Sequence, residues 1–183
     1  VAGVKRIVKL SVIGATEEAF SFAKIHRPVE RAVEASGIAW TFLRPNSFMQ
    51  NIRNFMAPTI RSQHSIYTLI PDVPFGHIDT RDVARVAAVA LTTRGHEGKA
   101  YTLTGPASFS YRDAAATITA VTGTPVSVVQ ISEADARAGM AAGGIPDFYA
   151  EYLIDLDRWY TERRADVVTS TVRDVTGRDA TSF

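Results

Sequence analysis

The stretch from His26 to Asn51, HRPVERAVEASGIAWTFLRPNSFMQN, decides the fold of this chain. Its first half has apolar residues at helical spacing, and Pro28 suits a first helical turn, where its missing N–H would be unpaired anyway. Gly37 is typical of the residue that follows a helix. The run from Ile38 to Leu43 is short, apolar and bulky, as expected of a strand covered on both faces. Pro45 ends this strand because proline cannot donate to a ladder.

This pattern predicts an α/β fold. Two other short apolar runs, Val4–Ser11 and Ala100–Thr104, have the same character as Ile38–Leu43. Together they predict a parallel sheet with helices packed on it. The polar segment Asn46–Asn51 follows a strand at its carboxyl end, where open parallel sheets bind ligands. We therefore expect the functional site at this edge of the sheet.

The composition is that of an ordinary globular domain. Hydrophobic residues make up 46% and charged residues 21% of the 183 positions, and the net charge is +1. Without a basic stripe, direct nucleic-acid binding is not expected. The chain has no cysteine, which excludes disulfides. No apolar run approaches the length of a membrane span and no signal peptide is visible, so we expect no membrane partner and a cytoplasmic location.

Several segments resemble the NmrA-like branch of the atypical short-chain dehydrogenases/reductases, a family that includes dye and quinone reductases and redox-sensing regulators. Their order and spacing carry the resemblance more than any single motif does. The matching segments are Val4–Ser11, His26–Glu34, Gly37–Asn51, Ile78–Leu91 and Gly98–Pro106.

The resemblance implies a partial Rossmann-like parallel sheet with a small α+β C-terminal lobe. Residues 1–124 would form the C-terminal part of an NAD(P)-binding domain, and residues 125–183 a substrate-side lobe interleaved with it. Gly3 reads as the residue after a helix, so the N-terminal dinucleotide-binding units are expected to be missing. No G-x-G-x-x-G occurs in the chain. The alternative is a naturally short chain with another first element.

The resemblance also directs attention to one helix. Conventional short-chain dehydrogenases have a catalytic tyrosine four residues before a lysine, and alignment through Gly37 places Phe22 and His26 at those positions. Phenylalanine cannot transfer a proton, whereas imidazole titrates near neutral pH. His26 is therefore the first catalytic candidate and Lys24 a second possible donor. The alternative for His26 is a partly exposed residue at a helix start.

Ser11 is the other catalytic candidate, because it ends a strand and related reductases can contact substrate with such a serine. Its alternative is the cap of a turn. The resemblance further implies a wall on the nicotinamide side of NADP or NAD. That wall would comprise His26, Pro45, Asn46, Phe48, Met49 and Asn51. A helix from Ser47 onward is expected to carry an apolar, mostly buried stripe at Phe48, Ile52, Phe55, Met56 and Ile60.

The segment Phe148–Tyr160 is an aromatic amphipathic helix. Tyr149 and Tyr152 are predicted to face the substrate pocket, or else the whole stripe forms the core of the small lobe. Other local signals are structural. Asp79 or Thr80 can cap the helix that follows, Asp82 is expected to order nearby backbone, and Ser110 with Asp113 resembles a capping box. The four histidines lack ligand spacing, so no metal site is predicted.

The complete protein is therefore expected to transfer hydride from NADPH or NADH to a quinone, a dye or a similar conjugated acceptor. Such an acceptor needs less help with proton transfer than a ketone, which suits the missing tyrosine. One alternative is a non-catalytic module that senses the nicotinamide pool and binds a regulatory partner protein; another is a chain without cofactor function. Without a pyrophosphate site, this stretch alone is expected to be inactive and to bind no NADPH.

Overall fold

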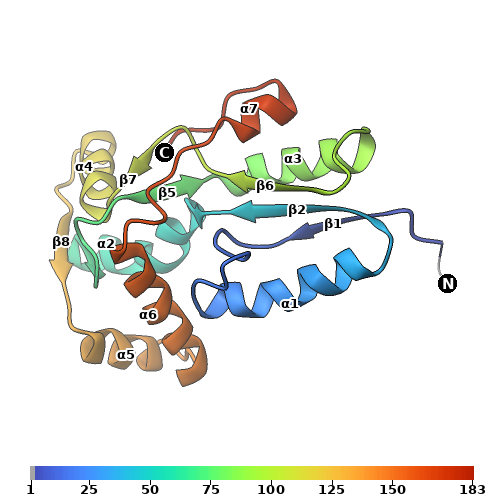
Figure 1. The fold of residues 1–183 in the computed structure, drawn as a ribbon. Helices are drawn as coiled ribbons and strands as arrows, with labels where there is room; N and C mark the ends of the chain where they lie inside the picture. Colours follow the sequence, from blue (N-terminus) through green and yellow to red (C-terminus); the bar gives the residue numbers. More distant parts are fainter. Residues whose placement is uncertain (1–2) are drawn as a thin grey trace.

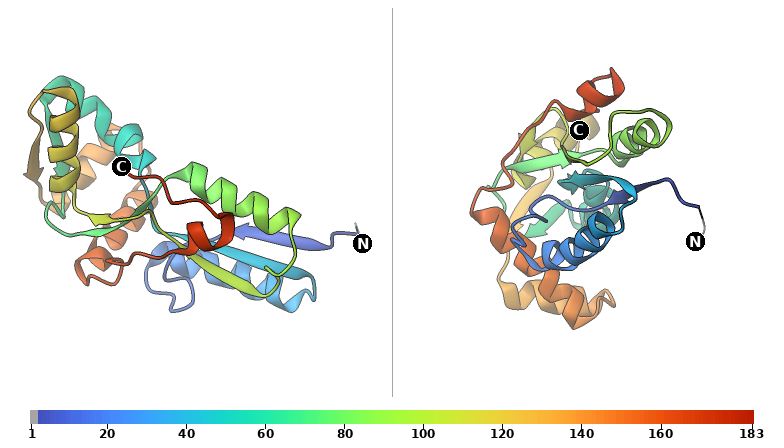
Figure 2. Two further views of the ribbon diagram at one scale, coloured as in Figure 1. Left: turned by 90° about the horizontal axis from the view of Figure 1, so that it is seen from above. Right: turned by 45° about the vertical axis from the view of Figure 1, so that its right-hand side comes forward.

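A computed structural model describes residues 3–183 (Figure 1). Its main sheet has the order β1-β2-β6, formed by Arg6–Leu10, Ala39–Pro45 and Lys99–Leu103. All three strands are parallel, with Ile7 beside Trp40 and Phe42 beside Ala100. Helix α1 (Ser21–Ala35) covers one face and helix α3 (Thr80–Thr92) the other (Figures 1 and 2). The predicted α/β fold with a parallel Rossmann-like sheet is confirmed.

Two smaller sheets extend from this layer. Strand β5 (Phe75–Ile78) pairs parallel with β3 (Ser47–Phe48) and antiparallel with β7 (Ser108–Phe109). Strand β4 (Ser65–Thr68) pairs parallel with β8 (Ser127–Gln130). Because β4 and β8 come from opposite sides of residue 124, the ranges 1–124 and 125–183 share a sheet. The division of the chain at that residue stays a prediction.

The remaining elements are helical. A π-helical turn, Ile52–Met56, leads into α2. Helix α6 lies beside the ends of β1 and β2 that face away from the N-terminus (Figure 1). Within residues 3–183, no helix combines the length and apolar character needed to cross a membrane. The bounds are Ala57–Gln63 for α2, Tyr111–Thr122 for α4, Glu133–Ala142 for α5, Asp147–Thr161 for α6 and Thr171–Thr176 for α7.

The start of α1 differs from the prediction. The helix begins at Ser21, so Pro28 lies in its interior rather than in its first turn. The reason is a tertiary contact: the backbone N–H and the hydroxyl of Ser21 both donate to Asp155 of α6, at 2.7 and 2.6 Å. This carboxylate satisfies the helix start, which no nearby side chain caps.

The segment after Asn46 also corrects the prediction. Residues 47–48 form a strand instead of the start of a helix, because Ser47 and Phe48 pair with β5 and Met49 N donates to the Ile78 carbonyl. The predicted stripe is broken as well, since the Phe55 side chain is 68% exposed while Ile52 is buried. The π turn holds one residue more than an α turn, so the three- and four-residue spacing no longer keeps one face.

Local capping signals are confirmed. Asp79 accepts a hydrogen bond from Arg81 N at 2.7 Å, and Ser110 with Asp113 forms the expected capping box. Gly37 has φ +70°, the left-handed conformation that glycine adopts without strain. Asp82 orders backbone as predicted, because its carboxylate accepts from Thr181 N at 2.7 Å and fastens the end of the chain to α3.

The buried apolar residues form two clusters. One lies between the main sheet and α3 and includes Leu43, Val86 and Leu103. The other lies where α1 meets α6, beyond the carboxyl ends of β1 and β2, and includes Phe20, Phe75, Trp159 and Tyr160. Ring pairs knit this second cluster together, with Phe20 and Trp159 centroids 4.5 Å apart and Phe75 stacked on Tyr160 at 4.3 Å. It fixes α6 against the edge of the sheet where the site is expected.

Candidate functional site

A cleft with a volume of about 220 Å³ lies beyond the carboxyl ends of β1 and β2. Four parts of the chain line it: the turn after β1, the first half of α1, the segment after β2, and α6. Its lining is mainly apolar, with a few polar groups. The lining residues are Leu10, Ser11, Val12, Ile13, Phe20, Phe22, His26, Pro45, Asn46, Ser47, Phe48, Asn51, Leu156 and Tyr160.

Most of the predicted site residues meet here. The structure brings together Ser11 and His26 with Pro45, Asn46, Phe48 and Asn51, which come from three separate segments. The carboxyl ends of the parallel strands β1 and β2 open on the same edge, which brings Ser11 near Asn46, and α1 adds His26 beside them. Their assigned roles in catalysis or cofactor binding stay predictions.

Three predicted residues lie elsewhere. Met49 is buried and packs toward Gly105, where an added Cβ would come within 2.9 Å of its terminal methyl. Tyr149 and Tyr152 pack edge-on against Phe22, with ring centroids 5.7 and 5.5 Å away, and do not line the cleft. Instead, both tyrosines pack against the ring of Phe22, which itself lines the cleft.

Helix α6 contributes Leu156 and Tyr160 to the cleft, two residues that were not predicted there. Leu156 and Tyr160 are one helical turn apart on the aromatic stripe that the sequence predicted. They lie further along the helix than Tyr149 and Tyr152, the two residues expected to face the cleft. Burial raises the pKa of Tyr160 well above its ordinary range, against the effect of a hydrogen bond with the Ser47 side chain. Tyr160 therefore keeps its proton and serves as a wall of the cleft.

His26 has a defined protonation state. Lys9 Nζ lies 2.8 Å from its Nδ1, and an ammonium group can only donate, so Nδ1 accepts and the ring proton belongs on Nε2. Burial lowers the pKa of His26, the Lys9 charge lowers it further, and the more distant Glu30 opposes both. The ring is thus neutral at pH 7, and its N–H donor is on Nε2, in a side chain that lines the cleft.

Lys9 is itself half-desolvated. Burial lowers the pKa of its ammonium, the Glu30 carboxylate acts to raise it, and the Arg44 guanidinium lowers it again. Sequence reasoning missed Lys9 because it alternates with apolar residues along β1, where a lysine usually reports a solvent-facing side. The contact with His26 spans 17 positions and depends on how α1 lies on the strand.

A buried ion network lies behind Ser11. The Glu30 side chain is fully buried and accepts hydrogen bonds from Ser11 Oγ at 2.6 Å and from Arg44 Nε and Nη2 at 3.0 and 2.7 Å. Arg27 Nη1 adds a contact at 3.1 Å. Burial acts to raise the pKa of Glu30, but the Arg44 and Ser11 hydrogen bonds outweigh it and the pKa is lowered. The Ser11 hydroxyl donates its hydrogen bond to Glu30. Its oxygen can therefore only accept a hydrogen bond from a ligand in the cleft.

The two asparagines differ in what they leave free. Asn46 Nδ2 donates to the Ala165 carbonyl at 2.9 Å, and its Oδ1 accepts from Ser47 N at 2.9 Å. Asn46 therefore shapes the loop, and a Cβ at Gly76 would come within 2.7 Å of its Nδ2. The Asn51 side chain makes no hydrogen bond within residues 3–183, and it is half-buried on the cleft wall, so its amide can pair with a ligand.

A parallel sheet with helices on both faces and a cleft at the carboxyl ends of its strands defines a Rossmann-like α/β domain. Comparison of the sequence with known protein families identifies the family. The NmrA-like family matches residues 2–178, and this chain belongs to that family.

Relatives and solved structures agree with this assignment. A (4-alkanoyl-5-oxo-2,5-dihydrofuran-3-yl)methyl phosphate reductase of Streptomyces griseus is 39% identical, over 100% of this chain and 64% of that protein. An NAD(P)H azoreductase of Xenophilus azovorans is 37% identical with the same coverage of both chains. The NADPH-dependent quinone oxidoreductase of Escherichia coli, solved in complex with NADPH, is 28% identical with a TM-score of 0.86, covering 99% of this chain and 64% of that one. The chain thus spans under two thirds of the length of these relatives.

Proposed function

We propose that this chain forms the nicotinamide-side and substrate-side part of a reductase. The reaction is hydride transfer from NADPH or NADH to a conjugated acceptor such as a quinone or a dye. The observation that carries the proposal is the cleft, which combines apolar walls with the Nε2–H of neutral His26 at the carboxyl edge of the sheet. The reductases among the relatives give the class of reaction.

The residues of the cleft fit the ring end of a nicotinamide cofactor. A volume of about 220 Å³ is below the roughly 300–1,000 Å³ of sites that enclose a whole drug-sized ligand, so it suits one ring and its amide. Phe48 and Leu156 offer flat apolar surface, and the unpaired Asn51 amide can bind a carboxamide. When bound, the cofactor supplies the hydride and its two electrons.

The role of His26 follows from its protonation state. Hydride addition to a conjugated acceptor leaves negative charge on a terminal oxygen or nitrogen, and a neutral imidazole can donate a proton there from Nε2. Lys9 can return a proton to Nδ1 through the 2.8 Å contact, so the ring changes tautomer and its charge is unchanged. The pair thus replaces the proton donor that Phe22 lacks.

The proposal is tested by cofactor oxidation with a panel of quinones and azo dyes, using the protein expressed from its full reading frame. His26→Phe should lower kcat about 10²-fold or more, in line with the loss of a positioned general acid. Arg31→Gln is the matched control: Arg31 lies on the same helix, is exposed and does not line the cleft, so its rate should stay within about twofold. An unchanged rate for His26→Phe would reject His26 as the donor.

The second candidate function is a nicotinamide-sensing module that acts on a partner protein. It is supported by Ser11 and Asn46, whose polar groups form hydrogen bonds within the protein. This favours a cleft that binds a ligand over one that reacts with it. Tight NADPH binding without turnover on any acceptor, by the full-length protein, would favour this candidate. A cytoplasmic location stays a prediction under either function.

A further inference from the structure

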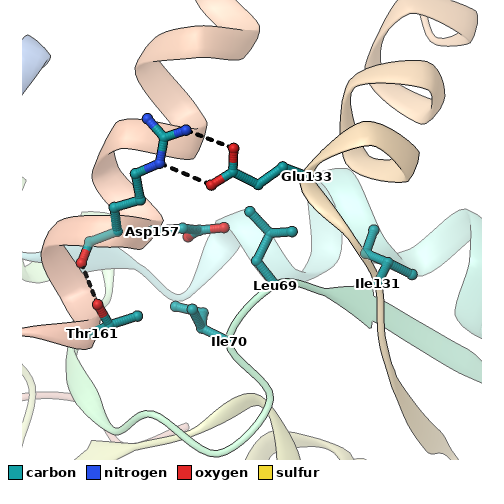
Figure 3. Close-up of a pocket in the computed structure, with 7 residues that line it drawn as sticks. Leu69, Ile70, Ile131, Glu133, Asp157 and Thr161 are labelled. Atoms are coloured by element: carbon teal, nitrogen blue, oxygen red, sulfur yellow. Dashed lines mark hydrogen bonds and ion pairs between the residues drawn. The ribbon is translucent and has the colours of Figure 1, made fainter.

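A second cavity, with a volume of about 240 Å³, opens on the neighbouring face of α6 (Figure 3). We call it the Asp157 cavity. Leu69 and Ile70, after β4, and Ile131, after β8, provide an apolar surface, while α5 and α6 provide the polar groups. The lining residues are Leu69, Ile70, Ile131, Glu133, Asp157, Arg158 and Thr161. None of them lines the cleft described above.

Asp157 has no polar partner in this cavity. Its carboxylate takes part in no hydrogen bond or ion pair within the described residues, and Figure 3 shows it directed from α6 toward Leu69. Burial raises the pKa of this carboxyl from 3.8 to about 7, with no cation close enough to offset the effect. A carboxylate among apolar groups is unfavourable unless a cation or hydrogen-bond donors accompany it.

The neighbouring charged groups are already engaged. Arg158 turns away to donate to both oxygens of Glu133, at 2.8 and 2.6 Å, and also reaches Glu151 at 3.3 Å. The phenols of Tyr111 on α4 and Tyr160 on α6 are near enough for the Asp157 charge to act on them. Burial, and in part Asp157 itself, raises the pKa of both, so they stay protonated. Asp157 is therefore the one group here that an incoming cation can neutralise, among the residues that the structure describes.

We propose that the Asp157 cavity binds a small organic amine, whose ammonium group pairs with the Asp157 carboxylate while its hydrocarbon part rests on Leu69, Ile70 and Ile131. The volume sets the size of the ligand. About 240 Å³ corresponds to roughly eight water molecules at ~30 Å³ each, which suits a short alkyl- or arylammonium ion and not a peptide or nucleotide. The proposal is independent of the reaction assigned to the cleft.

The test is an NMR titration of the chain with n-butylammonium chloride, following the amide resonances of Leu69, Ile70 and Ile131 at pH 8 and at pH 6. We expect saturable shifts at pH 8 and about tenfold weaker binding at pH 6. The reason is that a carboxyl with a pKa of about 7 is about 90% ionised at the higher pH and about 10% at the lower. 1-Butanol, which has the same body without the charge, should bind at least tenfold more weakly at pH 8.

Two variants complete the test. Asp157→Asn keeps the shape and removes the charge, so it should lower the affinity for n-butylammonium at least tenfold. Asp147→Asn is the matched control, since it removes an exposed acid from the same helix and should leave the affinity unchanged. Circular dichroism checks that both variants are folded. Equal affinity of wild type and Asp157→Asn, or equal affinity for 1-butanol and n-butylammonium, would overturn the proposal.

Discussion

Helix α6 lines both the cleft and the Asp157 cavity, and the acids beside them have different sets of hydrogen-bond partners. Behind the cleft, Glu30 is fully buried, yet its pKa is lowered because Arg44, Ser11 and Arg27 all donate to it. In the second cavity, Asp157 is only partly buried, yet its pKa rises to about 7 because nothing donates to it within residues 3–183. The number of donors, more than the degree of burial, decides whether an interior carboxyl keeps its charge.

The largest expected effect breaks the satisfied network. Glu30→Leu leaves the Arg44 and Arg27 guanidinium groups with a lost partner in a buried setting, which should lower the free energy of unfolding by about 3–5 kcal/mol. Glu34→Gln is the control, because Glu34 pairs with the same Arg27 at 2.8 Å from a more exposed position and should cost under about 1 kcal/mol. Urea denaturation at pH 7 measures both, and similar values for the two would contradict the comparison.

The next largest expected effect is on the pH dependence of the unfolding free energy, through Asp157. Because the pKa of Asp157 is higher in the folded state than in the unfolded chain, its contribution is fully favourable below about pH 4 and is lost as the pH rises to about 7. Asp157→Asn should remove this dependence. Relative to wild type, the variant should gain about 2–3 kcal/mol of unfolding free energy between pH 5 and pH 8, since one pKa unit corresponds to about 1.4 kcal/mol. Parallel curves for both proteins over this range would show that the carboxyl finds a partner in solution.

The smallest expected effect is on the pKa of His26, whose neighbour Lys9 lies beside the Glu30 network. Lys9→Met removes the second-largest cause that lowers the pKa of His26, so the pKa should rise toward its ordinary value. The change is measured by following the ring protons of His26 during an NMR pH titration. Lys5→Met is the control, because Lys5 is exposed and lies outside the strand. A His26 pKa that falls in Lys9→Met would show that Lys9 is not charged beside it.

Sequence reasoning reached features that depend on neighbours along the chain. Gly37 and the capping box of Ser110 are decided within a few residues, and the meeting of Ser11 with Asn46 follows from the rule that parallel strands open on one edge. The predicted site could be located for this reason, although the contact of Lys9 with His26 and the Glu30 network could not.

The features that were missed depend on distant partners. Glu30 has the sequence context of a surface residue, and only the approach of Arg44 and Ser11 makes its burial tolerable. The start of α1 depends on Asp155, which is 134 positions away from Ser21. Phe55 lies exposed within a π-helical turn, a conformation without a recognisable local signal. In each case the energy comes from a contact or a backbone geometry that periodicity does not encode.

The contact between Asp82 and Thr181 joins two residues that the ribosome synthesises at different times. Asp82 is fully buried, and besides Arg85, three residues away, the backbone amide and the hydroxyl of Thr181 donate to it from 99 positions later. At roughly 5–20 residues per second, about 5–20 seconds separate the synthesis of the two residues. During that interval the carboxylate at the start of α3 lacks its Thr181 donors, so this contact can form only after Thr181 has been synthesised.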